Sequence, residues 1–254
     1  MTSTGRTINS VEKSCEILQY LRQNNGGRIT EIAEDLEMSK GNVHHHLNTL
    51  RKHEFVTLDQ DEYDISLKFV DYGEHAKRSV EQYDVVREEI TQLADRVGEV
   101  INFAVEQHGR VIYLHKERAE GGVRTAAYPG TRLHMHCSAL GKAILAHYSQ
   151  DRISEIIKRH GLPAYTENTI TDEDQFRSEL QKTHETGVGY DYQEALEGVR
   201  CVAVPLRDQT GNVFGAISVS GPSRRFVEER FTEEIPEQLS QSANVIEVNL
   251  STQE

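Results

Sequence analysis

Three consecutive histidines, His44, His45 and His46, form a conspicuous group of reactive side chains in this 254-residue sequence. Imidazole can bind a metal ion, transfer a proton or donate hydrogen bonds. The run lies in "SKGNVHHHLNTL", residues 39–50, whose apolar residues recur at helical spacing. On a helix the three rings point in three directions, whereas two helical metal ligands need i,i+3 or i,i+4 spacing. The run therefore predicts three separate roles and no metal site.

The helix that carries the histidines has an apolar and a polar face. Val43, Leu47 and Leu50 share the apolar face, and His46 lies at its edge, where we expect a partly buried, hydrogen-bonded ring. The polar face and the basic helix end carry groups suited to base edges and phosphates. This set is Lys40, Gly41, Asn42, His44, His45, Asn48, Arg51 and Lys52. A solvated surface could have the same composition, so the neighbouring elements must decide.

Those neighbouring elements predict a winged helix-turn-helix domain. Helical spacing extends over residues 8–24 and again over "RITEIAEDLEMS", where we expect Thr30 to cap the helix. After the histidine helix, "EFVTL", the acidic turn "DQDE" and "YDISL" predict a two-stranded hairpin. Three helices followed by a hairpin are typical of a winged DNA-binding domain. Arg28 and Thr30, at the start of "RITEIAEDLEMS", complete the predicted DNA-binding set.

The remainder of the chain predicts a linker and a second domain. We assign residues 1–66 to the DNA-binding domain, 67–82 to a helical linker and 83–254 to the second domain. Residues 67–98 look like one long helical stretch with a single apolar stripe. The expected elements after it are strands at 100–107 and 110–117, a loop with Gly121-Gly122 and Pro129-Gly130, helices at 139–148 (capped by Ser138), 151–160 and 172–186, strands at 189–194, 200–208 and 213–221, and a helix from about 227 to 250. This order predicts an α+β domain with an antiparallel sheet.

Two groups in the second domain could carry out chemistry. Asp191 and Glu194 are paired carboxylates, and Cys201 or Cys137 could be a nucleophile near a histidine. The stretch "HMHC", residues 134–137, could bind a metal, but on a strand its cysteine points away from its histidines. Neither group completes a catalytic or metal-binding motif, so we expect no metal and no cofactor. A small-molecule-processing enzyme and a sequestering protein without DNA binding are the weaker alternatives.

Taken together, these segments resemble the IclR-type transcription regulators over nearly the full length. "EIAEDLEMSKGNVHHHLNTL" is similar to the family's "EIA…GL-x-KSTVHRLL-x-TL". His44 falls on the family's recurrent His, His45 on its Arg, and Gly41 and Asn42 on its Ser-Thr pair. Gly41 therefore lacks a hydroxyl, and His45 replaces a permanent cation by a side chain that titrates. These departures change the expected operator sequence and leave the docking mode as it is.

The resemblance continues in the second domain. "MHCSALGKAILA" is similar to "LHxTALGKALLA", and "GAISVSGPSRRF" is similar to "AALSVSGPxxRF". "GVGYDYQEALEGVRCVAVPLRD" keeps the spacing of the family signature except at Arg207, where an aromatic or His is usual. The resemblance implies a GAF-like α+β sensor that binds a small catabolic metabolite, such as a sugar, a sugar acid or another organic acid.

By position, the effector pocket would be formed by Ser138, Ala139, Leu140, Gly141, Asp191, Cys201, Ser218 and Ser220. The helix start would offer backbone N–H groups to an anion. Ser218 and Ser220 are two apart on a strand and share a side, although solvent-facing positions are an equal alternative for them. For Cys201 the alternative is a small buried hydrophobe. Asp191 would suit a ligand that carries hydroxyl groups.

Composition sets the remaining expectations. The net charge is −13, of which residues 1–79 contribute only −3, with ten Lys/Arg against thirteen Asp/Glu. A local basic surface can still dominate contacts with phosphates. Without an apolar signal core or a long apolar run, and with Cys15, Cys137 and Cys201 far apart, we expect a cytoplasmic protein with reduced thiols and no membrane partner. We predict a homodimer or homotetramer that binds double-stranded DNA at a palindromic operator, as activator or repressor, and binds a small-molecule effector.

Overall fold

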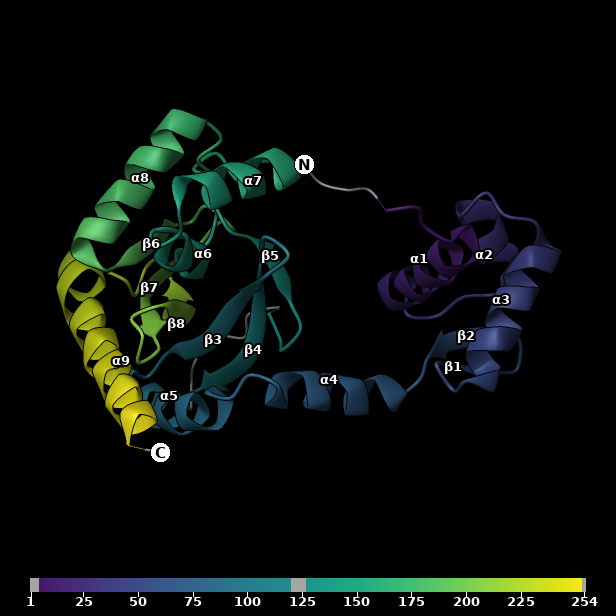
Figure 1. The fold of residues 1–254 in the computed structure, drawn as a ribbon, viewed down its shortest axis with the longest axis horizontal. Coiled ribbons are helices and arrows are strands. Elements are labelled where there is room, and N and C mark those ends of the chain that lie inside the picture. Colours follow the sequence, from purple (N-terminus) through teal and green to yellow (C-terminus); the bar gives the residue numbers. More distant parts are fainter. Residues whose placement is uncertain (1–4, 120–126, 253–254) are drawn as a thin grey trace. The chain divides into compact units, whose positions relative to one another are not determined.

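The computed structural model describes residues 5–119 and 127–252, and the chain divides into two compact units, residues 1–79 and 80–254 (Figure 1). The division falls within the segment that the sequence assigns to a linker. Each unit has its own hydrophobic core, so each can be described by itself.

The N-terminal unit is the predicted winged helix-turn-helix. Its elements are α1 (Asn9–Asn24), α2 (Ile29–Asp35), α3 (Lys40–Lys52), β1 (Val56–Asp59) and β2 (Glu62–Ile65). Ile17, Leu21, Ile32, Val43 and Leu47 form the centre of its core, so all three helices contribute apolar faces. The antiparallel hairpin is attached to the α1–α2 connection by paired hydrogen bonds between Gly27 and Tyr63, both 2.9 Å long.

One expected helix cap in this unit is wrong. Thr30 lies inside α2, one residue after the helix begins, and does not cap it. The cap position is Arg28, whose backbone N–H donates to the Glu31 carboxylate at 2.7 Å. The helix starts early because Gly27 is already fixed by its bridge to β2. At α3, by contrast, Ser39 caps the helix and accepts from the Asn42 N–H at 3.3 Å.

The helical stretch 67–98 is two helices, which corrects the expectation of a continuous one. α4 (Lys68–Arg78) ends at Ser79, and α5 (Tyr83–Val97) begins after a short turn. α5 buries Val86, Ile90 and Leu93, whereas no residue of α4 is buried. The buried apolar stripe therefore belongs to α5 alone.

The C-terminal unit is the predicted α+β domain around an antiparallel sheet of order β5-β4-β3-β8-β7-β6. Its strands are β3 (Val100–Gln107), β4 (Arg110–Arg118), β5 (Arg132–His134), β6 (Gly189–Tyr192), β7 (Val199–Arg207) and β8 (Val213–Pro222). Its other helices are α6 (Ala139–Leu145), α7 (Gln150–His160), α8 (Glu173–Thr186) and α9 (Ile235–Ser251), and a π-helical turn, η1 (Arg230–Glu234), precedes α9. The sequence predicted one uniform helix from about 227 to 250, but this segment contains the π-helical turn η1 before α9. The predicted Gly121-Gly122 turn lies outside the described residues.

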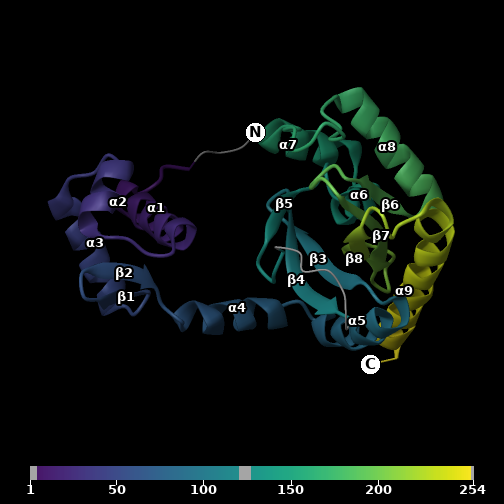
Figure 2. The ribbon, with the colours of Figure 1, turned by 180° about the vertical axis from the view of Figure 1, so that it is seen from behind.

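The two faces of this sheet have different partners (Figures 1 and 2). α5 and α9 cover one face, over large residues such as Phe103, Ile217 and Val219. α6 covers the other, over Ala104, Ala203 and Ala216, with α7 and α8 packed around it. Alternate residues of each strand serve the two faces. Within the described ranges, no helix combines the length and apolar character needed to cross a membrane.

Candidate functional site

The polar face of α3 is fully available for contact. All ten residues of the predicted DNA-binding set are exposed, whereas Val43, Leu47 and Leu50 of the same helix are buried. The set is Arg28 and Thr30 around the start of α2, and Lys40, Gly41, Asn42, His44, His45, Asn48, Arg51 and Lys52 on α3. An α-helix that exposes one continuous polar face fits the width of the DNA major groove.

The three histidines lie in three different environments. His46 is half-buried, and its Nδ1 hydrogen-bonds with the Ser14 hydroxyl at 2.9 Å, which joins α3 to α1. His44 contacts the Asn48 amide, whose Nδ2 lies 3.2 Å from its Nε2. His45 is exposed, with its ring centroid 6.1 Å from that of His44. Among residues 5–119 and 127–252, no group of three His, Cys, Asp or Glu side chains could hold a metal ion.

The wing is acidic and so contrasts with α3. A hollow beside the β1–β2 turn is lined by Arg28 and by four carboxylates, those of Asp59, Asp61, Glu62 and Asp64. Carboxylates repel DNA phosphates at short range. This hollow of the wing is therefore less favourable for DNA phosphates than the basic end of α3.

In the C-terminal unit, a row of polar side chains crosses the sheet face that α6 covers. Asp191 of β6 lies opposite Cys201 of β7, and Cys201 lies opposite Ser220 of β8. Ser218 shares the strand face of Ser220, and both serines are buried. The solvent-facing alternative for the two serines is therefore wrong, and the predicted sheet residues lie together.

Two further residues of this row, Asn102 and Lys116, were not predicted from the sequence. Asn102 of β3 lies opposite both Ser218 and Lys116. Its Nδ2 donates to Ser220 at 3.2 Å and to Ser218 at 3.4 Å, while its buried Oδ1 has no partner among the described residues. Buried acceptors without a partner are rare, so this oxygen is a candidate acceptor for a ligand. The signal in the sequence was a lone polar residue in "VINFAV".

At the start of α6 the predicted helix cap is confirmed, but part of the predicted anion site is already occupied. Ser138 caps the helix and accepts from the Gly141 N–H at 3.0 Å, so that N–H cannot serve a ligand. The Ala139 and Leu140 N–H groups remain candidates. Glycine is required at position 141 for packing, because a Cβ there would clash with the backbone oxygen of Met135.

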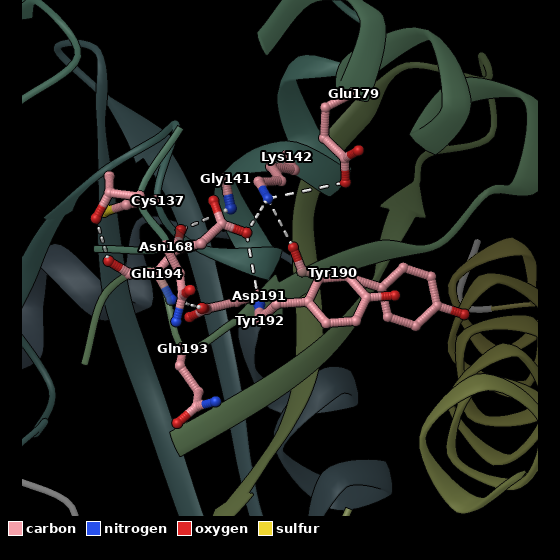
Figure 3. A network of polar contacts seen from close by, with 12 residues as sticks. Cys137, Gly141, Lys142, Asn168, Glu179, Tyr190, Asp191, Tyr192, Gln193 and Glu194 are labelled. Atoms are coloured by element: carbon pink, nitrogen blue, oxygen red, sulfur yellow. Dashed lines mark hydrogen bonds and ion pairs between the residues drawn. The ribbon is translucent and has the colours of Figure 1, made fainter. Parts of the chain in front are cut away.

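A buried lysine joins α6 to the strand that carries Asp191 (Figure 3). Lys142 is 0% exposed, and its Nζ donates to Glu194 Oε1 at 2.5 Å and to the Tyr190 carbonyl at 2.9 Å. Glu179 of α8 lies 3.8 Å from the same nitrogen. The Glu194 N–H in turn donates to Asp191 Oδ1 at 2.6 Å. Lys142 was missed as well, although a lysine inside the apolar run "ALGKAILA" was its signal.

The protonation of this region is unfavourable for cysteine chemistry. Burial, followed by the charge of Asp191, raises the pKa of Cys137 to about 12 and also raises the pKa of Cys201. Both side chains are therefore neutral thiols, whereas the thiolate is the nucleophile. Burial and the charge of Glu194 raise the pKa of Asp191 to about 7, against hydrogen bonds from backbone N–H groups. The region therefore combines neutral thiols with a carboxyl whose pKa lies near neutrality.

Comparisons with known proteins agree with this geometry. Residues 10–60 match the IclR helix-turn-helix domain, and residues 76–248 match the family described as bacterial transcriptional regulator IclR, C-terminal. The chain belongs to the IclR family. This IclR-family protein is accordingly a DNA-binding transcription regulator of a family that responds to small metabolites. Its relatives are regulators, so the enzymatic alternative is wrong.

Relatives of this IclR-family protein cover almost its whole length. It is 30% identical to the probable HTH-type transcriptional regulator ArcR of Halobacterium salinarum, over 97% of this chain and 95% of that protein. It is also 30% identical to the HTH-type transcriptional regulator KdgR of Escherichia coli, over 89% and 87%. The crystal structure of the Thermotoga maritima IclR is 28% identical, with a TM-score of 0.77 over 96% of this chain and 99% of that one.

Proposed function

We propose that this regulator binds a palindromic operator through α3 of paired subunits and changes its affinity when an effector binds beneath α6. The observation that carries the proposal is the buried polar row Asp191–Cys201–Ser220, beside an Asn102 oxygen that has no partner in the part of the chain that the structure describes. Such a row is costly in a domain core unless a ligand completes its hydrogen bonds. The protein would carry out this function in the cytoplasm.

On the DNA side, we assign base contacts to the middle of α3 and phosphate contacts to its ends. Asn42, His44, His45 and Asn48 carry donors that can reach base edges in the major groove. The phosphate contacts would come from Arg28, Thr30, Lys40, Arg51 and Lys52, while Gly41 would let the helix approach closely.

On the effector side, the pocket favours a small polar metabolite. Asn102 Oδ1 and the Asp191 carboxyl are acceptors that suit hydroxyl groups. The Ala139 and Leu140 N–H groups and the Lys116 ammonium suit a carboxylate. Lys116 currently donates to the Ala127 carbonyl at 2.6 Å, so a ligand would exchange that contact for its own. A sugar, a sugar acid or another organic acid fits this combination.

The coupling between effector and DNA would be a population shift transmitted by β4. Lys116 points to the effector face, and its neighbour His115 points to the other face, where its Nδ1 hydrogen-bonds with the Tyr83 hydroxyl at 2.9 Å. Tyr83 is the first residue of α5, which follows the α4 linker by four residues. A ligand that favours one position of β4 would therefore favour one position of α5. Because α5 follows the linker helix α4, that shift would change the spacing of the DNA-binding units of two subunits.

Paired subunits are part of the proposal, as a homodimer or a homotetramer. Two recognition helices are needed to occupy the two halves of a palindrome. α4 buries none of its residues, and Val70 and Tyr72 on it are 60% and 49% exposed. Exposed apolar residues of this kind support contact with a second copy.

The test is operator binding by fluorescence anisotropy on the promoter fragment of the protein's own gene, in a salt series. We expect binding that weakens with salt and is weaker in Asn48→Ala, with Gln23→Ala on α1 as an exposed control. A thermal-shift screen of metabolites should find stabilisation of the wild type that Asn102→Ala removes. Equal binding to an unrelated fragment at all salt concentrations would contradict the DNA-binding assignment.

A further inference from the structure

Beside the proposed effector pocket, two carboxyl groups and one ammonium group are buried together. Asp191 is 3% exposed, Glu194 is 2% exposed and Lys142 is 0% exposed. Glu194 Oε2 is also buried and has no partner among the described residues. With both carboxyls ionised, the group would hold one negative charge that nothing buried with it compensates, which is unfavourable in a low-dielectric interior.

The hydrogen bonds decide which carboxyl lacks a cation. An ammonium group has three donors, and those of Lys142 face the Tyr190 carbonyl, Glu194 Oε1 and Glu179. Asp191 is hydrogen-bonded to the Glu194 N–H and to the Cys201 thiol, neither of which is charged. Burial raises the pKa of Glu194 as well, but the charge and the hydrogen bond of Lys142 act against that rise. Asp191 has no hydrogen bond to Lys142 and is therefore the carboxyl that accepts a proton more readily.

We propose that the sensor binds a small carboxylate together with one proton carried by Asp191, and that Lys142 and Glu194 are positioning residues that assign the proton to Asp191. The inference rests on the proposed effector site. A carboxylate close to an ionised Asp191 would add a second uncompensated charge, whereas a protonated Asp191 can donate a hydrogen bond to it.

The charged and titratable groups around Asp191 support this assignment. They are Glu194 after β6, Lys142 of α6, Glu179 of α8, Cys201 of β7, Tyr113 of β4 and Cys137 before α6. Burial raises the pKa of Tyr113 and of both cysteines, so these three are neutral at physiological pH. Burial is the largest cause of the raised pKa of Asp191; of the neighbouring charges, that of Glu194 raises this pKa and that of Lys142 lowers it.

The sign of the pH dependence follows from thermodynamic linkage. Burial and the charge of Glu194 hold the pKa of Asp191 at about 7, above its ordinary 3.8. A bound carboxylate raises that pKa further, so binding takes up a proton when Asp191 is ionised in the free protein. Affinity should be level below pH 6 and should fall about tenfold per pH unit above pH 7. In the ligand-free protein, Asp191 should likewise lower stability as pH rises through 7.

The first arm of the test needs no ligand. The free energy of unfolding of the full chain is measured by urea at pH 6 and pH 8 for wild type, Asp191→Asn and Asp174→Asn, the last being an exposed carboxyl on α8. We expect wild type to lose stability relative to Asp191→Asn as pH rises, and to change in parallel with Asp174→Asn. Parallel curves for wild type and Asp191→Asn overturn the proposal.

The second arm measures binding of acetate, glycolate and D-gluconate by calorimetry at pH 6, 7 and 8, in two buffers of different ionisation enthalpy. We expect uptake of up to one proton and about tenfold weaker binding at pH 8 than at pH 6, with both effects absent in Asp191→Asn. Glu194→Gln should move the midpoint to lower pH, because it removes the repulsion; a purely structural role would leave the midpoint in place. Binding without proton uptake, or binding of none of the acids, overturns the anionic effector. In that case a metabolite found by the thermal-shift screen would still support the proposed function.

Discussion

The substitution Lys142→Met should destabilise the C-terminal unit more than any surface change. Methionine keeps the length and approximate volume of the lysine side chain but removes its charge and its donors. Lys142 is 0% exposed, and its partner Glu194, at 2.5 Å, is also buried. After the substitution, Glu194 would keep a buried charge without a cation, and the Tyr190 carbonyl would lose its lysine donor.

The magnitude follows from that loss. Removing one partner of a buried ion pair costs about 3–5 kcal/mol, because the other charge stays buried and unpaired. For a unit of this size, each kcal/mol lowers the melting temperature by about 2–4 °C, so a fall of roughly 6–20 °C is expected. Glu194→Gln in the Lys142→Met background should recover part of the loss, because it removes the stranded charge.

The assay is urea unfolding followed by far-UV circular dichroism, since the chain has no tryptophan to report by fluorescence. Lys182→Met, at an exposed position of α8, is the matched control and should change stability by less than about 0.5 kcal/mol. A loss of less than about 1 kcal/mol in Lys142→Met would refute the argument, because it would mean that the Glu194 charge is stabilised by other groups. Equal losses in the single and double variants would refute the pairing in particular.

Three further predictions concern α3 and α6. His45→Ala and Asn48→Ala should each weaken operator binding about 5- to 150-fold in anisotropy while thermal stability stays unchanged, and unchanged binding would remove that residue from the contact face. His45→Arg should tighten binding and steepen the slope of log affinity against log salt by about 0.9, since the longer, permanently charged side chain can reach past the base edges to a phosphate; an identical slope would contradict this. Gly141→Ala should cost at least about 1–3 kcal/mol in urea unfolding, because its Cβ would meet the Met135 backbone, and a neutral result would show that α6 can shift.

The sequence was sufficient for elements whose signal is local. The helical period of α3 located the buried Leu47 and separated His46 from His44 and His45, and Ser138 capped α6 as its residue type and position predict. The break between α4 and α5 was missed because residues 79–82 contain neither Pro nor Gly. Thr30 was given the wrong role because a bridge between Gly27 and Tyr63, distant in sequence, fixes where α2 begins.

The missed site residues depend on pairings that no local pattern contains. Asn102 belongs to the pocket because β3 lies between β4 and β8, a sheet order that involves a long crossover. Lys142 belongs to the charge network because α6 packs on β6 and β7, so its partners come from segments about 40 to 50 residues away. A polar residue in an apolar run indicates that a partner exists, but only the tertiary structure identifies the partner.

The small residues of the sheet explain why we place the proposed pocket under α6 and not under α5 and α9. On the α6 face, the strands carry Ala104, Ala203 and Ala216, whereas the opposite face carries large side chains that fill the space to α5 and α9. α6 can approach β6 closely because residue 189 is a glycine: a Cβ there would lie 2.5 Å from the Ala139 carbonyl oxygen. The start of α6 is thereby held near Asp191, and the alternation along β8 places Ser218 and Ser220 on that face while Ile217 and Val219 complete the core behind it. β8 therefore contributes residues both to the core and to the proposed effector site. A ligand that shifts Ser218 and Ser220 would also shift Ile217 and Val219, which pack in the core with α5.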